Sequence, residues 1–237
     1  MFTLAIDDGL ARLTLDRPER RNAIPAAQWG ALVERIDAAR GARALIVTGA
    51  QGAFCAGADL ADFPMMLDEA ARFRLAMRGA LDVLRGLPIP TIALIDGACY
   101  GAGVALAMAC DLRLAASDAP FAITPAKIGI SYPQEDVHRL VELVGPGQAA
   151  RLLLTGLSID GAEAARIGLV ELAAPLAERE AAIEAILANG AESLAALKRA
   201  IRLAADGART DAGQDREFDA LLGGAELARR LEARRKK

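Results

Sequence analysis

Apolar and polar residues alternate at the start of the chain and then change to a helical period. Residues 2–6 and 10–15 alternate on either side of Asp7-Asp8-Gly9, which predicts two short strands joined by a glycine-containing turn. Apolar residues then follow the i, i+3, i+4, i+7 spacing of an amphipathic helix, expected over residues 28–39. They are Trp29, Leu32, Val33 and Ile36.

Two apolar runs of strand length follow, and each opens into a stretch of small residues. Residues 44–48 predict a buried strand that leads into a loop over 49–59. Residues 91–95 predict a second buried strand, followed by a turn over 96–100 and an apolar helix from Gly101 to near Cys110. Between the two runs we expect a helix over 68–87, ended by Pro88 and Pro90.

The pattern in the second half of the chain is mainly helical. Short strands are expected at 112–115 and 121–123, with a weaker strand signal at 168–172. The expected helices are 133–144, 147–154, 162–167, 176–187, 193–205 and 214–235. We therefore predict an α/β core over residues 1–185 and a helical segment over residues 186–237.

Composition and charge narrow the class of partner. The chain has 54% hydrophobic but only 4% aromatic residues, which favours small aliphatic side chains packed between helices and a sheet. A net charge of -3, with acidic and basic residues interspersed, gives no reason to expect nucleic acid or a membrane as partner. The uncharged run 97–110 is shorter than the roughly 20 residues of a membrane-spanning helix. The first residues lack the pattern of a secretory signal, so we expect a cytoplasmic protein.

The three cysteines predict neither disulfides nor a metal site. Cys55, Cys99 and Cys110 are odd in number and show no CxxC spacing. We expect reduced thiols and no bound metal.

Two loops rich in small residues carry the candidate chemistry. One spans 52–60 and the other 97–103, each directly after a predicted strand, and the second also opens a helix. Small residues let a ligand atom approach the backbone, and the first turn of a helix has unpaired N–H groups at the positive end of its dipole. Together the loops predict a site that stabilises an oxyanion with backbone amides.

The sequence contains no motif for binding nucleotides, but it does contain one candidate motif for a catalytic nucleophile. A dinucleotide fingerprint would need glycine where Leu106 stands, and no GxxxxGK[ST] run occurs. Gly97-Ala98-Cys99-Tyr100-Gly101 does match a GxSxG nucleophile elbow with cysteine in place of serine.

That elbow defines a second hypothesis, a Cys99-dependent hydrolase. In it His138, the only histidine, is the base, and Asp118 or Asp136 orients it. The short separation of Cys99 and His138 leaves little room for the strands that usually carry an acid and a base, and the first loop has no role. The simpler interpretation makes Cys99 a small buried residue and His138 a helix-surface residue.

The ordered motifs resemble the crotonase, or enoyl-CoA hydratase/isomerase, family over essentially the whole chain. The resemblance is carried by Leu15-Asp16-Arg17-Pro18 with Arg21-Asn22-Ala23-Ile24, Phe54-Cys55-Ala56-Gly57-Ala58-Asp59-Leu60, Asp96-Gly97 through Gly101-Ala102-Gly103, Cys110-Asp111-Leu112-Arg113-Leu114-Ala115, and Thr155-Gly156 ahead of residues 162–170.

The resemblance implies a fold and a ligand. It implies a spiral of ββα units followed by a C-terminal helical segment used in assembly, with a homotrimer or a dimer of trimers as the expected state. The implied substrate is an acyl-CoA, so coenzyme A would enter as part of the thioester, and no separate cofactor is expected.

The resemblance also implies site residues. The amides of Ala58 and Ala102 would bind the thioester oxygen, with Ala56, Asp59 and Leu60 beside the substrate. Three basic residues are candidates for contacts with the phosphates or the adenine end of coenzyme A. They are Arg17, Arg20 and Arg21.

The sequence departs from the family pattern at the two glutamates that hydratases use to activate water and to deliver a proton. Ala105 and Pro125 stand at those positions, and neither side chain transfers a proton. Isomerase- or decarboxylase-type chemistry is therefore favoured over standard hydration, and a catalytically weak CoA-binding homologue is a further alternative.

Residues 124–136 hold the candidates for a replacement proton carrier. Their T-P…G…Y pattern is similar to that of methylmalonyl-CoA decarboxylase, in which the tyrosine lies beside the reacting acyl group. Tyr132 is the first candidate for proton transfer and Glu135 the second, with Asp136 as a further carboxylate.

Overall fold

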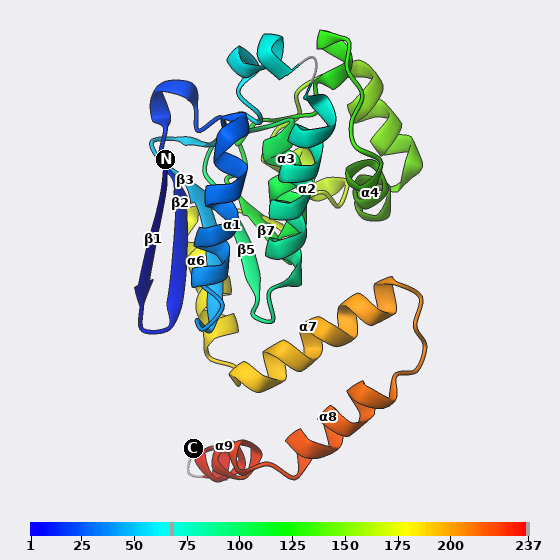
Figure 1. Ribbon diagram of the computed structural model, residues 1–237. Coiled ribbons are helices and arrows are strands. Elements are labelled where there is room, and N and C mark those ends of the chain that lie inside the picture. Colours follow the sequence, from blue (N-terminus) through cyan, green and yellow to red (C-terminus); the bar gives the residue numbers. More distant parts are fainter. Residues whose placement is uncertain (67–68, 236–237) are drawn as a thin grey trace.

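The computed structural model describes residues 1–66 and 69–235 and contains two sheets (Figure 1). The larger sheet has the strand order β1-β2-β3-β5-β7-β9 and the smaller one β4-β6-β8. β1 (Phe2–Asp7) and β2 (Leu10–Leu15) form the predicted antiparallel hairpin, and the other neighbouring strands pair in parallel. Asp8 (φ 44°) and Gly9 (φ 79°) make the turn, which needs positive φ at both positions.

The chain repeats a strand, strand, helix unit three times. In each unit the first strand joins the large sheet and the second joins the small one. The units are β3 (Ala44–Gly49), β4 (Ala53–Cys55) and α2 (Ala70–Gly86); β5 (Thr91–Ile95), β6 (Ala98–Tyr100) and α3 (Ala102–Ala109); β7 (Leu112–Ala115), β8 (Phe121–Ala122) and α4 (Gln134–Thr155). This arrangement confirms the expected spiral of ββα units.

Two strands of the small sheet lie where the sequence predicted a loop and a turn. β4 falls in the segment 49–59 and β6 in the segment 96–100, so both predictions were wrong. Strands of three small residues have no periodicity to detect, and their position depends on close backbone packing. A Cβ on Gly97 would lie 2.0 Å from the carbonyl oxygen of Gly52, so glycine is needed where the β5–β6 connection meets the β3–β4 connection.

The helices follow the predicted pattern with two qualifications. α1 (Trp29–Ala38) and α2 agree with the prediction, although Asp68, at the start of the predicted second helix, lies outside the described residues. α4 is interrupted at Gly145 (φ 74°, ψ 161°) before Pro146, which matches the two helices expected there. The single helix expected over 214–235 was wrong: α8 (Ala212–Leu222) and α9 (Ala225–Arg235) are separated at Gly223-Gly224.

Short elements complete the chain. These are the 3₁₀ helices η1 (Pro18–Arg20), η2 (Ala26–Gln28), η3 (Leu60–Met66) and η4 (Pro125–Ile128), with α5 (Gly161–Arg166), β9 (Leu172–Ala173), α6 (Leu176–Leu187) and α7 (Ala191–Ala205).

Apolar side chains pack on both faces of the large sheet. The main core joins β2, β3 and β5 to α1, α2 and α3. A smaller cluster formed by Ile46, Ile92, Leu94, Leu114 and Ile183 places α6 against the opposite face. Residue 186, the predicted domain boundary, therefore falls in the last turn of a helix that packs on the core.

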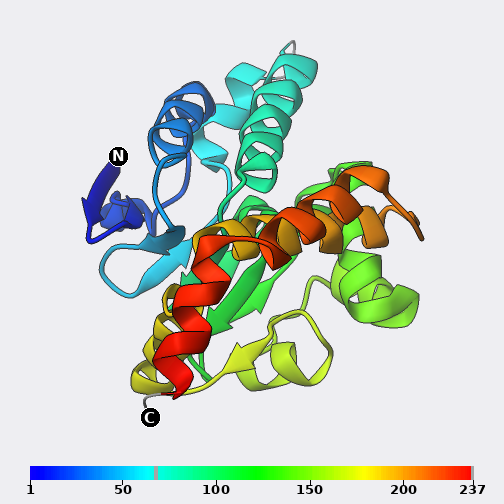
Figure 2. The ribbon, with the colours of Figure 1, turned by 90° about the horizontal axis from the view of Figure 1, so that it is seen from below.

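The C-terminal helices extend away from the core (Figures 1 and 2). α8 and α9 contain no buried residue. Within the described residues no helix combines the length and apolar character needed to cross a bilayer.

Candidate functional site

A cavity of about 490 Å³ lies where the two small-residue loops meet. Its wall includes Ala56, Gly57, Ala58 and Leu60 after β4, and Gly101 with Ala102 at the start of α3. The remaining wall comes from η3 and α2 on one side and residues 124–133 on the other. We call this cavity the acyl pocket, after the acyl group that the family resemblance leads us to expect there.

Two backbone amides in the acyl pocket have no hydrogen-bond acceptor among the described residues. Ile24 pairs with the first loop by donating from its N–H to Gly57 O (2.8 Å) and accepting from Asp59 N–H (3.0 Å). The intervening Ala58 N–H therefore points away from Ile24 and stays unpaired. Ala102 is the first residue of α3, so its N–H has no partner within the helix.

Gly57 brings these amides together. A Cβ on Gly57 would lie 2.8 Å from Tyr100 O and 3.1 Å from Ala102 N, so the first loop contacts the start of α3 directly. With standard bond lengths, this contact places the nitrogens of Ala58 and Ala102 within about 7 Å of each other. Two hydrogen bonds of about 3 Å to one shared oxygen would need the nitrogens within about 6 Å of each other, a separation that this upper bound allows.

Asn22 holds the first loop in place. It is fully buried, its Nδ2 donates to Ala50 O (2.9 Å) and Ala53 O (2.8 Å), and its Oδ1 accepts from Arg17 N–H (2.9 Å). The sequence showed Asn22 only as part of a motif and did not reveal this role, because the two carbonyls that it holds, of Ala50 and Ala53, lie about thirty residues away.

An ion pair between Arg17 and Asp59 also holds the first loop in place. Arg17 Nη1 lies 2.6 Å from Asp59 Oδ2, and this contact holds the pKa of Asp59 below its ordinary value of 3.8. Because the folded-state pKa is depressed, this stabilisation is present above about pH 4 and is lost as the pH falls through the folded pKa.

Asp59→Asn is expected to lower the free energy of unfolding at pH 7 by about 1–3 kcal/mol, because Arg17 loses a charged acceptor. Urea unfolding of both proteins at pH 7 and at the lowest pH where both fold should show the difference shrinking in acid. Glu19→Gln is the matched control, because Glu19 also faces Arg17 but at 3.6 Å and on the surface. An equal loss at both pH values would contradict this account.

Tyr132 is the main polar side chain near the two amides. Its hydroxyl donates to Gly101 O at 2.9 Å. Burial raises the pKa of Tyr132 well above 10, and the negative charge of Asp136 acts in the same direction. The phenol therefore keeps its proton at neutral pH.

Glu135 and Asp136 lie outside the acyl pocket. Both border a smaller cavity next to Ala105. Asp136 is buried, its Oδ1 accepts from Arg78 at 3.0 Å, and its Oδ2 has no partner among the described residues. Burial raises the pKa of Asp136 above its ordinary value. Glu135 is exposed, so the structure does not bring it to the two amides.

Comparisons with known proteins agree with this fold. A profile of the family described as Enoyl-CoA hydratase/isomerase matches residues 5–222. This chain belongs to the enoyl-CoA hydratase/isomerase family. It is 36% identical over 203 residues to mouse "Enoyl-CoA hydratase domain-containing protein 2, mitochondrial", covering 83% of this chain and 69% of that protein.

Solved structures give the same assignment. An enoyl-CoA hydratase/carnithine racemase from Magnetospirillum magneticum superposes with a TM-score of 0.93 at 31% identity, covering 99% of this chain and 92% of the other. An enoyl-CoA hydratase from Bacillus anthracis has a TM-score of 0.89 at 28% identity, with 99% and 96% covered. The expected crotonase-like α/β fold is confirmed.

The basic residues proposed for substrate binding lie beside the first loop of this family member, not in the wall of its acyl pocket. Arg17 is engaged by Asp59, while Arg20 and Arg21 are exposed. Of the remaining substrate-binding predictions, Ala56 and Leu60 line the pocket, whereas Asp59 is buried behind it.

Sequence reasoning missed one wall of the pocket in this enoyl-CoA hydratase/isomerase family chain. Phe63 and Phe73 pack edge to face with centroids 6.3 Å apart, and Met77 and Arg74 follow on α2. Phe73 and Met77 lie on the helix that the sequence predicts over residues 68–87, but periodicity alone does not separate a core face from a pocket face. Arg74 is the only charged side chain among the described residues of this wall.

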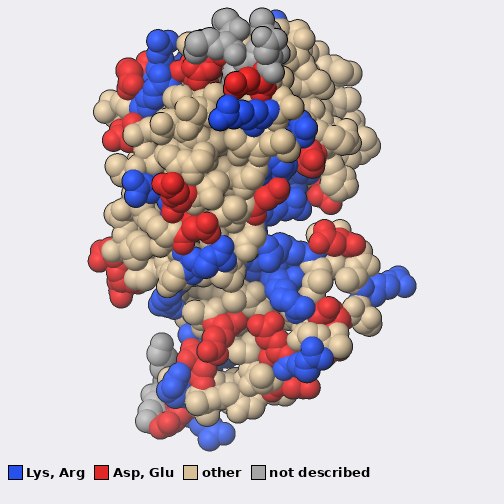
Figure 3. Space-filling model, viewed as in Figure 1, with Lys and Arg blue, Asp and Glu red and all other residues tan. Residues whose placement is uncertain are grey.

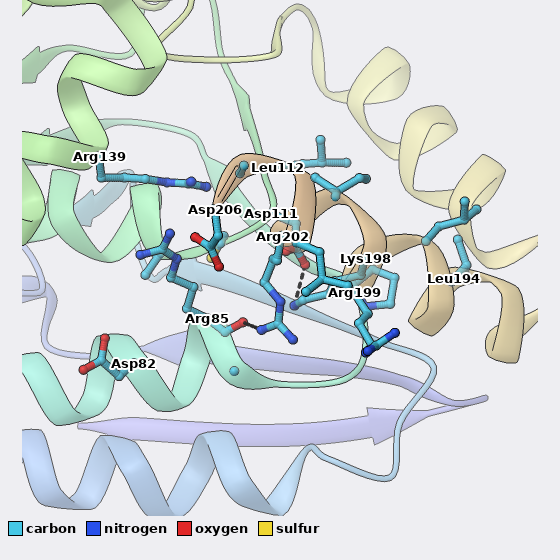
Figure 4. A pocket seen from close by; sticks show the side chains of 18 of the residues that line it. Asp82, Arg85, Asp111, Leu112, Arg139, Leu194, Lys198, Arg199, Arg202 and Asp206 are labelled. Atoms are coloured by element: carbon cyan, nitrogen blue, oxygen red, sulfur yellow. Dashed lines mark hydrogen bonds and ion pairs between the residues drawn. The ribbon is translucent and has the colours of Figure 1, made fainter. Parts of the chain in front are cut away.

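A larger cavity, of about 810 Å³, separates α7 from the core (Figures 3 and 4). Its wall combines apolar and charged side chains. Two of the charged ones are engaged there: Lys198 Nζ lies 2.6 Å from Asp111 Oδ2, and Arg202 donates to Arg85 O at 2.6 Å. Neither small-residue loop is among its lining residues.

The structure does not favour the hypothesis of a Cys99-dependent hydrolase with His138 as its base. Cys99 is fully buried and its pKa is raised well above 9 by burial, whereas the His138 side chain is 68% exposed and lies 3.3 Å from Glu142. The thiolate needed for nucleophilic attack is therefore disfavoured.

Cys99 is expected to resist alkylation in the native enoyl-CoA hydratase/isomerase family protein. Iodoacetamide at pH 8 should leave Cys99 unmodified by peptide mass spectrometry, and Cys99→Ala should retain thioester turnover, because the thiol is buried and protonated. Denatured protein is the labelling control. Rapid native modification with loss of turnover would revive the hydrolase hypothesis.

Proposed function

We propose that this chain binds an acyl-CoA in the acyl pocket and stabilises the enolate of its thioester with the amides of Ala58 and Ala102. The supporting observation is that both unpaired N–H groups belong to residues of one pocket and meet through Gly57. Donors fixed by backbone geometry need no reorganisation as negative charge develops on the thioester oxygen. Coenzyme A enters as part of this substrate.

Decarboxylation of a malonyl-type thioester fits the pocket best. The described wall contains no carboxylate side chain, and Ala105 and Pro125 replace the glutamates of family hydratases. Loss of carbon dioxide needs no base: the electron pair of the breaking carbon–carbon bond passes into the enolate, and the α-carbon then takes a proton from solvent. Arg74, the one charged side chain among the described residues of this wall, can bind the carboxylate of the substrate before it leaves.

Isomerisation of an enoyl thioester is the second candidate, because it needs only one proton carrier. Asp136 supports it: this buried carboxyl has an elevated pKa and borders Ala105, where a family glutamate would stand. Glu135 remains a weaker candidate for the same step.

A thioester panel in deuterated water tests the proposal. Methylmalonyl-CoA, 3-enoyl-CoA and 2-enoyl-CoA esters would be incubated with the protein and analysed by mass spectrometry. Deuterium at the α-carbon after loss of carbon dioxide would identify a decarboxylase, and deuterium with a shifted double bond an isomerase. Binding without deuteration of any ester would favour a CoA-binding homologue and overturn the enolate proposal.

We also propose that the C-terminal segment assembles the chain into trimers. α8 and α9 bury none of their own residues, and they expose Phe218, Leu222 and Leu231. α7 adds Leu197 and Ile201 beside the larger cavity, which a second copy would cover.

Light scattering should give three or six times the 24.8 kDa chain mass. Ile201→Glu should shift the protein toward monomer, because the charge would be buried in the contact. Ile6→Glu on β1, an exposed site remote from α7 in sequence, is the control. A monomeric wild-type protein at micromolar concentration would contradict assembly.

A further inference from the structure

The peptide that joins Gly101 to Ala102 has a backbone conformation that requires glycine. Gly101 has φ 52° and ψ -118°, and a Cβ there would meet no atom within 4 Å. Conformation and not space therefore selects glycine at this position. This conformation turns the chain from β6 into α3, whose first residue, Ala102, lines the pocket and has no helical acceptor for its N–H.

Three donors converge on the carbonyl oxygen of the same peptide. Within α3 it accepts from Val104 N–H at 3.0 Å and from Ala105 N–H at 3.3 Å. The shortest contact, 2.9 Å, comes from the Tyr132 hydroxyl, on a segment that forms the opposite side of the acyl pocket. Tyr132 thus links the two sides of the pocket through the backbone.

A planar trans peptide carries its C=O and N–H in opposite directions. A donor held on Gly101 O therefore restricts the direction of the Ala102 N–H. It also polarises the amide, which makes this N–H a stronger donor to a thioester oxygen.

The same contact argues against proton transfer by the phenol. The Tyr132 proton is already directed at a backbone carbonyl, so transfer to a substrate carbon would break this bond. The pKa of Tyr132, raised by burial, also disfavours the phenolate that would have to form.

We propose that Tyr132 is a positioning residue that orients and polarises the Ala102 amide through the Gly101 carbonyl and does not itself transfer the proton. This inference rests on the proposed enolate function, because it assigns Ala102 N–H to the thioester oxygen. In this proposal Tyr132 does not transfer a proton. It strengthens the hydrogen bond that the Ala102 N–H donates to the thioester oxygen.

The carbonyl stretch of a bound thioester measures that strength directly. Isotope-edited infrared spectra of [1-¹³C]butyryl-CoA should show the thioester carbonyl shifted to lower frequency on binding the wild-type protein. Tyr132→Phe should lose part of this shift while calorimetry shows little change in the dissociation constant. Any α-carbon deuteration should slow about 3- to 10-fold, the effect of one net hydrogen bond, with an unchanged pH profile.

The chain offers a matched control and a second perturbation, because it contains only two tyrosines. Tyr100→Phe removes the other hydroxyl, which makes no hydrogen bond within the described structure and should leave the shift unchanged. In that background, uniform 3-fluorotyrosine labels Tyr132 alone. Fluorine makes the phenol a stronger donor, so the carbonyl shift should increase, opposite to the effect of phenylalanine.

The outcomes separate this inference from the proposed function. A wild-type shift that neither Tyr132→Phe nor fluorotyrosine changes would overturn the positioning role and leave the oxyanion site intact. A changed pH profile with an unchanged carbonyl shift would also overturn it, in favour of proton transfer. Absence of any shift in the wild-type complex would overturn the oxyanion site and the inference together.

Discussion

Replacing Ala102 by proline is expected to lower thioester turnover by about 10²–10³-fold, the usual effect of removing one oxyanion donor. Ala102 is the first residue of α3, where proline fits the helix and where the N–H has no helical acceptor. Gly101 precedes it and has no Cβ to collide with the proline ring. The substitution therefore removes the donor with little change in the helix.

Ala191→Pro is the matched control. Ala191 is also the first residue of a helix, α7, and the preceding Gly190 has an extended conformation suited to proline (φ -69°, ψ 129°). Both variants should melt close to the wild-type temperature, but only Ala102→Pro should lose turnover in the reaction that the thioester panel identifies. Full activity of a folded Ala102→Pro protein would remove this amide from the chemistry.

Gly57→Ala is expected to disturb both stability and turnover. The new Cβ would lie 2.8 Å from Tyr100 O and 3.1 Å from Ala102 N, and the backbone has φ 98°. The conformation alone costs about 1–3 kcal/mol for a residue with a Cβ. Relief of the contact must move the first loop away from α3, which separates the two amides, so turnover should fall by about 10²-fold or more.

Gly52→Ala is the control that separates the effect of backbone strain from the effect of moving the first loop away from α3. Gly52 lies at the other end of β4, in the β3–β4 connection, and has φ 77°, but a Cβ there meets no atom within 4 Å. It should lose about 1–2 kcal/mol of stability and keep most of its turnover. Chemical unfolding together with the thioester assay measures both effects. Equal loss of turnover in the two variants would show that loop strain, not the distance between the amides, controls the site.

Hydrophobic periodicity, apolar runs and helix breakers within single segments were sufficient to predict much of the fold. The period of Trp29, Leu32 and Ile36 predicted α1, and the apolar runs of β3 and β5 predicted buried strands. Helix breakers located the interruption at Gly145-Pro146. By contrast, Gly223-Gly224 was passed over in a continuous helical pattern, although the chain breaks there.

The candidate site was only partly predictable, because the exposure and the partners of its charged residues depend on how distant segments pack. The ordered motifs pointed to Ala58, Ala102 and Tyr132, and all three line one pocket. Glu135 lies one residue before the buried Asp136, and only the placement of α4 decides which carboxyl is exposed. The contact of Arg17 with coenzyme A stays a prediction, and only the folded loop shows that Arg17 pairs with Asp59.

The sequence by itself determined the family through the order of its motifs, and its periodicity predicted α1 and the buried strands β3 and β5. The replacement of both hydratase glutamates, by Ala105 and Pro125, stays a prediction from residue identity. Only the tertiary structure decided which amides stay unpaired, that Gly57 brings Ala58 to α3, and that the Tyr132 hydroxyl is bonded to a backbone carbonyl. These features depend on contacts between segments about thirty to forty-five positions apart, and such contacts leave no local periodicity in the sequence.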